Sequence, residues 1–443
     1  SDIQDRLVNL INVPDINLRS NLYTTEDFLD SLQVSKNYMA DQNLYIRERI
    51  FDMWIGDWNK TNENWEWQSH TVNDSVIYTP IVIDRNHAFT KVDGVLFKQM
   101  LKMLSLDFIC NYDSLILKDT KKINKLAFAL DMAVAGRSDE SVWIRQAQEI
   151  RKQMTDSLID SAFTYLPEGV KHDEIELIKR KLKRRRLELE AVASQYYRLL
   201  QRTPVVAGTN QSDYFLIERQ APDRTILRIY DPETGDCRLE QQFSGRETKE
   251  LWLYGLAGND TFEVKGNTRK DFPIYLISGE GENQYQLNHN RKIHVYDKDY
   301  KYDYQKIKYH KISFTPWGIY DSDKGISLGT FFTYTMYGFK RAPFTYQHRI
   351  GYNYLKGFMY AGVFPNYDGR RRLYLNASIS SPRNFENFFG FGNNTAGYKE
   401  EKKNYNRVKL RTYMLNPSFE MDLRKEEVVT FFGSLDMYKA CLL

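Results

Sequence analysis

The sequence has little of several features that mark common protein classes. Its three cysteines, Cys110, Cys237 and Cys441, are too far apart for a zinc site, and nothing favours a disulfide between any two of them. No apolar run approaches about 18 residues, so we expect no transmembrane helix. The 62 basic and 58 acidic residues leave a net charge of only +4. So small a charge gives no reason to expect nucleic acid as a partner.

Aromatic residues are unusually frequent in this chain. They make up 14% of its 443 residues, with 31 tyrosines, whereas the charged fraction of 27% is ordinary for a folded protein. Tyrosine-rich strands suit sheet surfaces and the aromatic belts of membrane barrels. The length allows roughly two to four domains. The chain starts at Ser1 without a signal peptide or initiator Met and stops at Leu443, so we expect a segment of a longer protein.

Changes in hydrophobic periodicity predict a multidomain α+β chain. We expect a mainly helical part over residues 1–203, a small β-roll over 204–311, and antiparallel strands over 312–443. The longest predicted helix runs from His172 to Leu200 and carries seven basic residues between Lys179 and Arg186. This basic run could bind lipid headgroups or nucleic acid, but a solvated helix face is the interpretation we favour.

One stretch near the start of the chain contains a possible phosphoryl-transfer motif. An amphipathic helix with Ile46, Ile50, Met53 and Trp54 on one face leads into a polar loop, a Trp-flanked strand and a short apolar strand ending at Asp84. This order resembles the catalytic segment of atypical kinases, whose pattern is helix, D-R-H-x-x-N, strand, D-x-x-x-x-F. The matching residues here are Asn59-Lys60-Thr61-Asn62-Glu63-Asn64 and Asp84-Arg85-Asn86-His87-Ala88-Phe89.

The kinase resemblance implies a metal and nucleotide site without its base. Asn64 and Asp84 fall on the positions that hold magnesium and the nucleotide phosphates, whereas Asn59 takes the place of the catalytic aspartate. An amide cannot accept a proton as a carboxylate does, so we assign no catalytic residue. Asp57 could replace the base only if the loop shifts. Residues 1–45 also offer no glycine-rich hairpin with a nucleotide lysine, and we favour an inherited scaffold over residual phosphoryl transfer.

A degenerate repeat organises the middle of the chain. Its copies begin at Gly208, Gly255 and Ser278 and place Asp213, Asp260 and Asn283 at equivalent positions, 47 and 23 residues apart. This spacing predicts stacked coils of roughly 23 residues, with a worn coil near Thr234-Gly235-Asp236.

The repeat is similar to the calcium-binding RTX nonapeptide. That resemblance implies calcium at Asp213, Asp260 and Asn283. The alternative is that these residues only form turns while aromatic side chains stack in the core, namely Phe215, Phe262 and Tyr285.

Residues 312–443 alternate between apolar and polar side chains in strands of about ten residues, the length that spans a bilayer when tilted. We expect six or seven strands, which as a barrel would have open edges. Either a barrel is truncated or the strands form a soluble sandwich, and we favour truncation. The predicted apolar sets are Ile326, Leu328, Phe332, Tyr334 and Met336; Phe344, Tyr346, Ile350, Tyr352 and Tyr354; Leu373, Leu375, Ala377 and Ile379; Val408, Leu410 and Met414; and Val429, Phe431, Leu435 and Met437.

Five segments together resemble one protein family. The turn Asn384–Asn394 resembles the NFFGxGN turn of BamA/TamA-like surface-antigen barrels. Together with IFDMWIGDWNKTNENWEW, DRNHAFTKVDG, ETKELWLYGLAGNDTFEVKG and LISGEGENQYQL, it resembles a Bacteroidetes-type outer-membrane family often labelled metallophosphoesterase or BamA/TamA-like. The phosphoesterase signature, Asp-x-His followed by Gly-Asn-His-Asp/Glu, is absent, so that activity is not assigned.

The family resemblance implies an outer-membrane location, with a periplasmic or surface-exposed globular part attached to a β-barrel. The expected partners are membrane lipid and other outer-membrane or periplasmic proteins. We favour a non-catalytic interaction module. The alternatives are a phosphotransferase or phosphatase-linked enzyme whose catalytic parts lie partly outside this chain, and a calcium-stabilised adhesion module.

Overall fold

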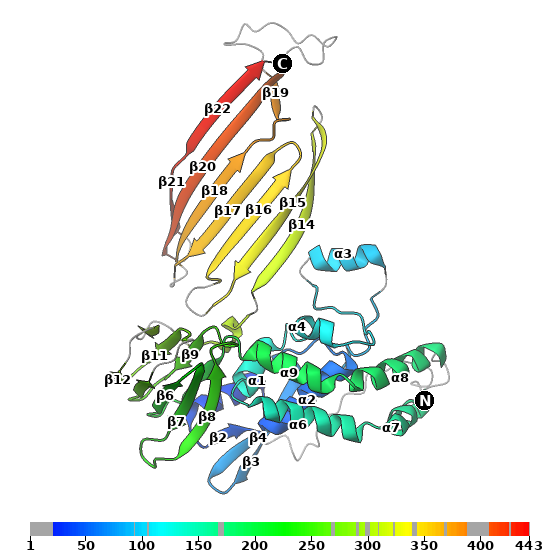
Figure 1. Cartoon of the computed structure of the whole chain (residues 1–443), viewed down its shortest axis with the longest axis vertical. Helices are drawn as coiled ribbons and strands as arrows, with labels where there is room; N and C mark the ends of the chain where they lie inside the picture. Colours follow the sequence, from blue (N-terminus) through cyan, green and yellow to red (C-terminus); the bar gives the residue numbers. More distant parts are fainter. Residues whose placement is uncertain are drawn as a thin grey trace. The chain divides into compact units, whose positions relative to one another are not determined.

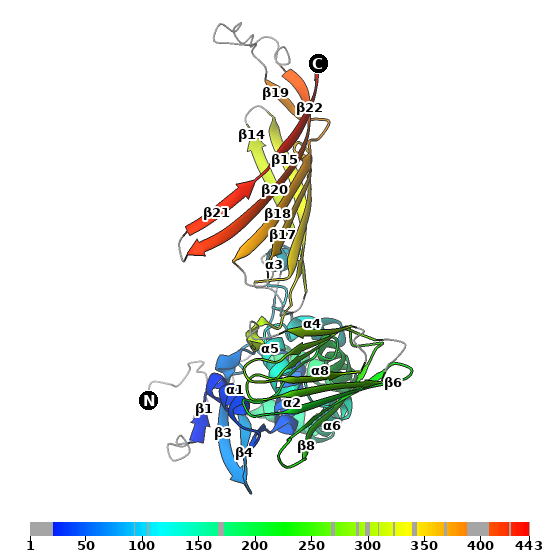
Figure 2. The same cartoon turned by 90° about the vertical axis from the view of Figure 1, so that its left-hand side faces the viewer.

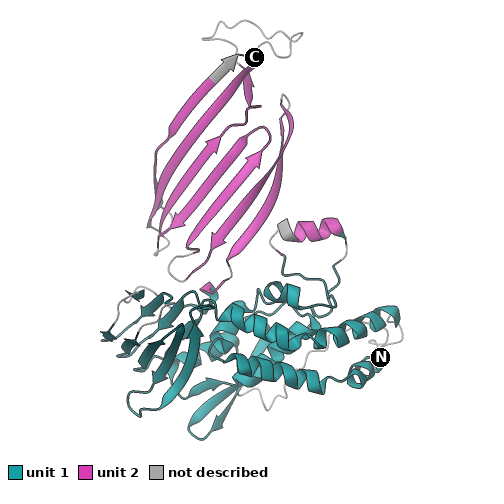
Figure 3. Ribbon diagram, viewed as in Figure 1, with its two compact units in different colours: residues 1–94, 107–305 teal, residues 95–106, 306–443 magenta. Residues whose placement is uncertain are grey.

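The computed structural model describes residues 21–92, 94–103, 106–166, 172–266, 271–288, 292–296, 302–308, 310–321, 324–338, 343–366, 370–387, 407–424 and 427–442. It contains about 28% helix and 40% strand, in several sheets of which none closes within these residues. The chain divides into two compact units (Figures 1 and 3). Unit 1 comprises residues 1–94 and 107–305, and unit 2 comprises residues 95–106 and 306–443. The predicted helical part and β-roll therefore share one compact unit.

Unit 1 begins with a helical part. Thr24 caps the first helix, because its hydroxyl accepts a hydrogen bond from the Asp27 N–H. The predicted helix from His172 to Leu200 is two helices. The chain breaks at Leu187 and Glu188, and the Glu188 carboxylate accepts hydrogen bonds from the N–H groups of Ile116 and Leu117. The helices of unit 1 are α1 (Thr25–Val34), α2 (Gln42–Ile55), α4 (Thr120–Ile123), α5 (Phe128–Ala135), α6 (Glu140–Gln153), α7 (Asp156–Ala162), α8 (His172–Arg186) and α9 (Leu189–Leu200), with short 3₁₀ turns at Asn62–Asn64, Leu117–Asp119, Phe163–Tyr165 and, at the boundary with unit 2, Tyr304–Lys306.

A small sheet lies beside these helices. Its strands are β1 (Leu22–Tyr23), β2 (Tyr38–Ala40), β3 (Trp65–Val72) and β4 (Ser75–Val82), in the order β1-β3-β4-β2. Trp67 of β3 stacks on Phe28 of α1 with ring centroids 3.7 Å apart, and both side chains are fully buried. This contact fixes the hairpin that carries the loop after α2 on one side and Asp84 on the other.

The β-roll forms as the repeat predicted. β5 (Val205–Ala207), β9 (Leu251–Tyr254), β11 (Ile274–Ile277) and β13 (Ile293–Tyr296) pair in parallel in one sheet. β6 (Tyr214–Gln220), β10 (Thr261–Gly266) and β12 (Gln284–Leu287) pair in parallel in the other. Their register aligns Tyr214 with Thr261 and Thr261 with Gln284, so the three preceding residues, Asp213, Asp260 and Asn283, lie in one column.

The worn coil expected near Thr234-Gly235-Asp236 is wrong. These residues form the turn of an antiparallel hairpin, β7 (Arg224–Tyr230) and β8 (Cys237–Ser244), which extends the sheet of β6. A glycine-rich turn serves a hairpin and a coil equally well, so the local sequence does not separate them. The expected aromatic stack is present. Phe215, Phe262 and Tyr285 stack in succession, with ring centroids 4.6 and 5.6 Å apart.

Polar contacts join the helical part to the β-roll within unit 1. Gly136, after α5, accepts hydrogen bonds on its carbonyl from the amides of Gln201 and Gln241, both buried. Lys36 forms a buried ion pair of 2.9 Å with Asp231. These contacts explain why the two predicted domains form one compact unit.

Unit 2 is dominated by one antiparallel sheet of nine strands, which Figures 1 and 2 show as a single layer. Its order is β14-β15-β16-β17-β18-β20-β19, and β21 and β22 also pair with β20. The single helix described in this unit, α3 (Val95–Met103), lies against β14. The strands are β14 (Lys311–Asp321), β15 (Gly325–Met336), β16 (Tyr346–Asn353), β17 (Gly357–Pro365), β18 (Arg371–Ile379), β19 (Phe385–Asn387), β20 (Arg407–Arg424), β21 (Glu427–Phe432) and β22 (Leu435–Leu442).

The strand count predicted from sequence was too low. The apolar pattern from Val429 to Met437 is two strands, because the chain breaks at Gly433 and Ser434. The predicted turn Asn384–Asn394 contributes β19, and residues 388–394 of it lie outside the described residues. The structure describes an open sheet and does not show a closed barrel.

The two faces of this sheet differ in polarity. Directly opposed residues share a face, so the register defines a continuous apolar row from β14 to β22. The next row lies on the opposite face and is mostly polar. The apolar row is Phe314, Phe332, Ile350, Tyr360, Ala377, Leu415 and Leu435, and the polar row is Ser313, Thr333, Arg349, Ala361, Asn376 and Asn416.

Four of the predicted apolar sets agree with this register where the structure describes their pairing. Val408, Leu410 and Met414 are the exception, because β20 places them on the face of Asn416. The residues of β20 that face the apolar side include Tyr413, Leu415, Phe419 and Met421, and also the basic residues Lys409 and Arg411. Both alternating sets of β20 contain apolar residues, so its pattern alone did not define its face.

Candidate functional site

The segment that resembles a kinase forms a compact polar centre under the end of α2. Tyr45, Arg49 and Asp52 follow one another at helical spacing on α2, and all three are buried. The helix ends at Gly56, which has φ +79° and donates its N–H to the Asp52 carbonyl. A Cβ at this position would lie 2.6 Å from the Tyr112 ring, so glycine is required by both backbone and space.

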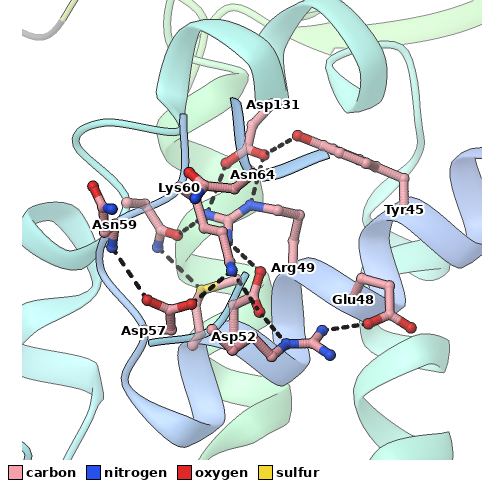
Figure 4. A network of polar contacts seen from close by, with 12 residues as sticks. Tyr45, Glu48, Arg49, Asp52, Asp57, Asn59, Lys60, Asn64 and Asp131 are labelled. Carbon is pink, nitrogen blue, oxygen red and sulfur yellow. Dashed lines mark hydrogen bonds and ion pairs between the residues drawn. The ribbon is translucent and has the colours of Figure 1, made fainter. Parts of the chain in front are cut away.

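Arg49 is the hub of this centre (Figure 4). Its guanidinium donates to Asp131 Oδ1 at 2.8 Å, to Asp131 Oδ2 at 3.2 Å, to Asp52 Oδ2 at 3.1 Å and to Asn124 Oδ1 at 2.6 Å. The Asp131 carboxylate also accepts hydrogen bonds from the hydroxyls of Tyr45 and Tyr196. Burial lowers the pKa of Arg49, but the charges of Asp131 and Asp52 outweigh it and hold that pKa well above its usual range. The ion pair is therefore charged, buried and hydrogen-bonded on both sides.

A second cation, Lys60, fills the space beneath the loop. Its side chain is only 1% exposed, and its ammonium lies 2.6 Å from Asp57 Oδ2 and 3.6 Å from Asp52 Oδ1. It also donates to the backbone carbonyl of Asp84. Burial raises the pKa of Asp57 and Lys60 opposes that rise. The Lys60 ammonium thus lies among the oxygen atoms beside Asp84 and stabilises the loop through its ion pairs with Asp57 and Asp52.

The two predicted metal positions are brought together, but with an unsuitable orientation. Asn64 Nδ2 lies 3.4 Å from Asp84 Oδ2, so the amide presents a donor to the carboxylate. The Asn64 carbonyl oxygen accepts from the Thr61 N–H at 2.7 Å and the Thr61 hydroxyl at 3.0 Å. Magnesium requires oxygen ligands, and the one oxygen of Asn64 is already used to shape the loop. Among the described residues, no group of three or more His, Cys, Asp or Glu side chains could hold a metal.

The position of the missing base offers no substitute. Asn59 is partly exposed, and its N–H lies 3.4 Å from Asp57 Oδ1. Asp57 itself is buried, and its carboxylate already forms an ion pair with Lys60. The arrangement is suited to stabilising a fold. It provides neither a free base nor a ready oxygen site.

A further cation, Arg185, closes the C-terminus of α2. It donates to the carbonyls of Met53, Trp54 and Asp113 at 2.6 to 2.8 Å and lies over the Tyr112 ring. A positive charge at this end of a helix is favourable, because the last carbonyls have no intrahelical partners. Four more residues of the basic run contact the protein itself, namely Lys179 with Glu176, Lys181 with the Tyr112 carbonyl, Lys183 with Asp160, and Arg186 with Asp156 and the Met154 carbonyl.

Sequence reasoning did not identify the residues that dominate this centre. Arg49 and Asp52 were visible as charged residues on an apolar helix face, which is a signal of a buried ion pair. Asp131 gave no local signal, because it is joined to Arg49 across 82 residues of sequence. Lys60 takes the place of the arginine in the kinase pattern, and that position gives no indication that the side chain is buried between carboxylates.

The predicted calcium residues form a hydrogen-bonded column in the β-roll. The Asp213 N–H donates to Asp260 Oδ1 at 2.9 Å, and the Asp260 N–H donates to Asn283 Oδ1 at 2.8 Å. Asp213 Oδ2 accepts from the N–H and hydroxyl of Thr209. These oxygens therefore face N–H and O–H donors, whereas calcium needs a shell of acceptors. Calcium binding at this column stays a prediction, and a rise in melting temperature on adding calcium would support it.

Asp260 is the exceptional member of the column. Its side chain is fully buried, and Oδ2 lies against Gly255 with no hydrogen-bond partner among the described residues. Burial raises the pKa of Asp260 to about 7. Near neutral pH this carboxyl is therefore partly protonated, whereas Asn283 holds the equivalent position without charge.

Comparison of the chain with protein-family profiles, curated proteins and solved structures finds no match. None of the helices in the described ranges has the length and apolar character needed to cross a membrane.

Proposed function

We propose that this chain is a non-catalytic module of the bacterial outer membrane. The nine-stranded sheet of unit 2 lies in the bilayer as part of a BamA/TamA-like β-barrel. Unit 1 is an interaction platform for other outer-membrane or periplasmic proteins. The observation that carries the proposal is the exposed apolar face of the sheet.

On one face of this sheet the exposed side chains are apolar, which is the opposite of what a sheet in water is expected to show. Along β14 the residues alternate between partly buried and exposed, and the exposed set includes Ile312, Phe314 and Tyr320. Leu328, Phe332 and Ile350 on the next two strands are also exposed on this face. Monomeric soluble proteins rarely expose an apolar patch that extends across so many strands. A hydrocarbon environment removes this cost.

The opposite face has the polar character of a water-facing barrel interior. Arg372 lies 3.4 Å from both Glu420 and Asp422, and the Tyr374 hydroxyl donates to Glu420 at 2.7 Å. Arg349 lies over the Phe331 ring on the same face. Alternation of apolar and polar residues along each strand is the pattern of membrane barrels.

Aromatic side chains gather at both ends of the strands. At the end where β14 begins, Tyr346 lies near Tyr334, with ring centroids 6.1 Å apart. At the other end, Tyr352 lies 4.7 Å from Phe358. Aromatic belts at both membrane interfaces are typical of outer-membrane barrels.

The centre of unit 1 supports the non-catalytic part of the proposal. Its charges are committed to one another, with Lys60 between Asp57 and Asp52 and with the Asn64 oxygen bound to Thr61. Such an arrangement stabilises a fixed surface without offering a reacting group.

The test is a pair of lysine substitutions on adjacent residues of β18. Leu375 belongs to the apolar face and Asn376 to the polar face. In an exporting bacterial host, we expect wild type and Asn376→Lys in the outer membrane, resistant to carbonate and released by detergent. We expect Leu375→Lys to be lost from that fraction, because lysine on the lipid face costs about 2–4 kcal/mol near the bilayer centre.

Recovery of wild type in the soluble fraction without detergent would contradict the proposal. Equal behaviour of Leu375→Lys and Asn376→Lys would contradict it as well, because it would mean that the two faces meet the same solvent.

The alternative function is phosphotransferase activity, and the proximity of Asn64 to Asp84 is the observation that favours it. It predicts that ATP with magnesium raises the melting temperature of wild type and that Asp84→Ala abolishes the shift. No shift in wild type would leave this alternative without support.

A further inference from the structure

The helix α3 departs from the unit that surrounds it in sequence. Residues before and after it belong to unit 1, whereas residues 95–106 group with the sheet of unit 2 (Figure 3). The helix lies against β14, and Figure 1 shows it beside the end at which that strand begins. The short helix α3 therefore belongs to the same compact unit as the sheet of unit 2.

The apolar surface of α3 is wider than this packing uses. Leu101 is buried, whereas Phe97 is exposed. Leu96 and Met100 are four residues apart and therefore share the adjoining flank of the helix. Leu96 is 87% exposed, and Met100 is also exposed. Lys98 falls on the opposite side of the helical wheel from Leu96 and Met100. An apolar flank of this kind has an unfavourable contact with water.

Two features of α3 indicate what covers this flank. The helix adjoins the strand whose apolar face begins at Ile312, which is itself exposed. Its sequence from Val95 to Met103 also contains two lysines and no acidic residue. A short amphipathic helix with a basic polar side and exposed Leu and Phe residues is the type that lies in a membrane interface.

We propose that α3 is an interfacial helix that lies in the surface of the same membrane that holds the sheet. Leu96 and Met100 enter the boundary between headgroups and acyl chains, and the lysine side favours anionic phosphate groups. This inference rests on the proposed membrane location of the sheet. It adds a second attachment, made by a segment that precedes the sheet by about two hundred residues of sequence.

The test uses a fluorophore that reports lipid contact. In the full chain with Cys110, Cys237 and Cys441 replaced by alanine, single cysteines are introduced as Leu96→Cys, Lys98→Cys and Leu328→Cys. Each is labelled with NBD and reconstituted into phosphatidylcholine–phosphatidylglycerol vesicles with or without doxyl-labelled lipid. Leu328 is an exposed residue of the apolar sheet face and reports insertion of the sheet.

We expect a blue-shifted emission at position 96 and roughly threefold stronger doxyl quenching there than at position 98. Quenching at 328 without quenching at 96 would overturn this inference and leave the proposed function standing. Quenching at neither would overturn both. Equal quenching at 96 and 98 would also overturn it, because a helix lying flat presents one side to the lipid.

Discussion

The two units place charged and apolar side chains in opposite environments. In unit 1, Arg49, Asp52 and Asp131 are almost completely buried. In unit 2, Leu328, Phe332 and Ile350 are more than half exposed. By a simple rule that apolar residues lie inside and charges outside, both units would be anomalous.

Each anomaly has a physical explanation, and the explanations differ. Buried charges are tolerated in unit 1 because each has a partner of opposite charge and further hydrogen bonds. Exposed apolar residues in unit 2 are tolerated if the surrounding solvent is hydrocarbon. The comparison shows that burial must be judged together with what surrounds a side chain. The proposed function therefore places the two units of one chain in two different solvents.

The largest expected effect comes from breaking the buried pair of unit 1. Asp131→Asn keeps the shape of the side chain but removes the charge that faces Arg49. We expect a loss of about 3–5 kcal/mol in the free energy of unfolding of unit 1, because the guanidinium is left with too little opposing charge. The free energy of unfolding is measured by denaturant titration of the full chain, in which pulse proteolysis reports the fraction of unit 1 that remains folded.

The matched control is Glu190→Gln, which removes the partner of Arg151 in a surface pair of 2.8 Å. It should cost no more than roughly 1 kcal/mol. A similar cost for the two variants would mean that the buried network contributes no more than a surface pair. The buried charges of unit 1 would then be no special feature to set against the exposed apolar face of unit 2.

The second prediction applies the same change to both units. Leu415 on the apolar sheet face is 41% exposed and Leu177 of α8 is 42% exposed. In lipid vesicles, Leu415→Lys should destabilise the sheet by about 2–4 kcal/mol, whereas Leu177→Lys should change unit 1 by roughly 0.5 kcal/mol or less. Denaturant titration with proteolysis of each unit measures both. Equal effects would show that the two leucines meet the same solvent.

Part of this architecture could be read from local sequence. The spacing of Asp213, Asp260 and Asn283 predicted the column of the β-roll, because parallel coils repeat side chains at a fixed interval. The faces of β15 and β18 were predicted because their apolar and polar residues alternate clearly. β20 was assigned to the wrong face, because apolar residues occur on both of its sides.

The proximity of Asn64 and Asp84 was predicted from the sequence, but their hydrogen bonding and the residues around them were not. The kinase resemblance located Asn64 and Asp84, and the structure brings them within 3.4 Å of each other. It did not indicate that the Asn64 oxygen binds Thr61, since an amide can present either end. The Arg49–Asp131 pair joins distant parts of the chain, and a single sequence contains no signal for such pairing.

The third prediction concerns Asp260 and pH. Because its folded pKa of about 7 exceeds its ordinary value near 4, the folded state retains a proton that the unfolded state has lost. The contribution of this group is therefore fully present at low pH and is lost as pH rises from about 4 through 7. Asp260→Asn should remove this loss and stabilise unit 1 at pH 8 by on the order of 2 kcal/mol.

Thermal unfolding from pH 4 to pH 8 provides the measurement. Asp213 raises the pKa of Asp260 and Lys36 lowers it, so both residues are kept in every variant. Asp236→Asn, in the exposed turn between β7 and β8, is the control and should leave the pH profile unchanged. A wild-type profile without a decline toward pH 7 would be evidence against a buried, protonatable carboxyl.

The smallest expected effect is the most informative about function. Asn59→Asp restores a carboxylate at the position where the kinase pattern has its base, on a loop that is partly exposed. We expect less than roughly 1 kcal/mol of destabilisation from repulsion by Asp57, and no phosphoryl transfer from ATP with magnesium. The reason is that a base alone does not supply metal ligands while the Asn64 oxygen is bound to Thr61 and Lys60 fills the space beside Asp84. The contradicting result would be transfer of labelled phosphate by Asn59→Asp that is abolished by adding Asp84→Ala. It would show that the loop can open to a nucleotide and that unit 1 lacks only the base for phosphoryl transfer.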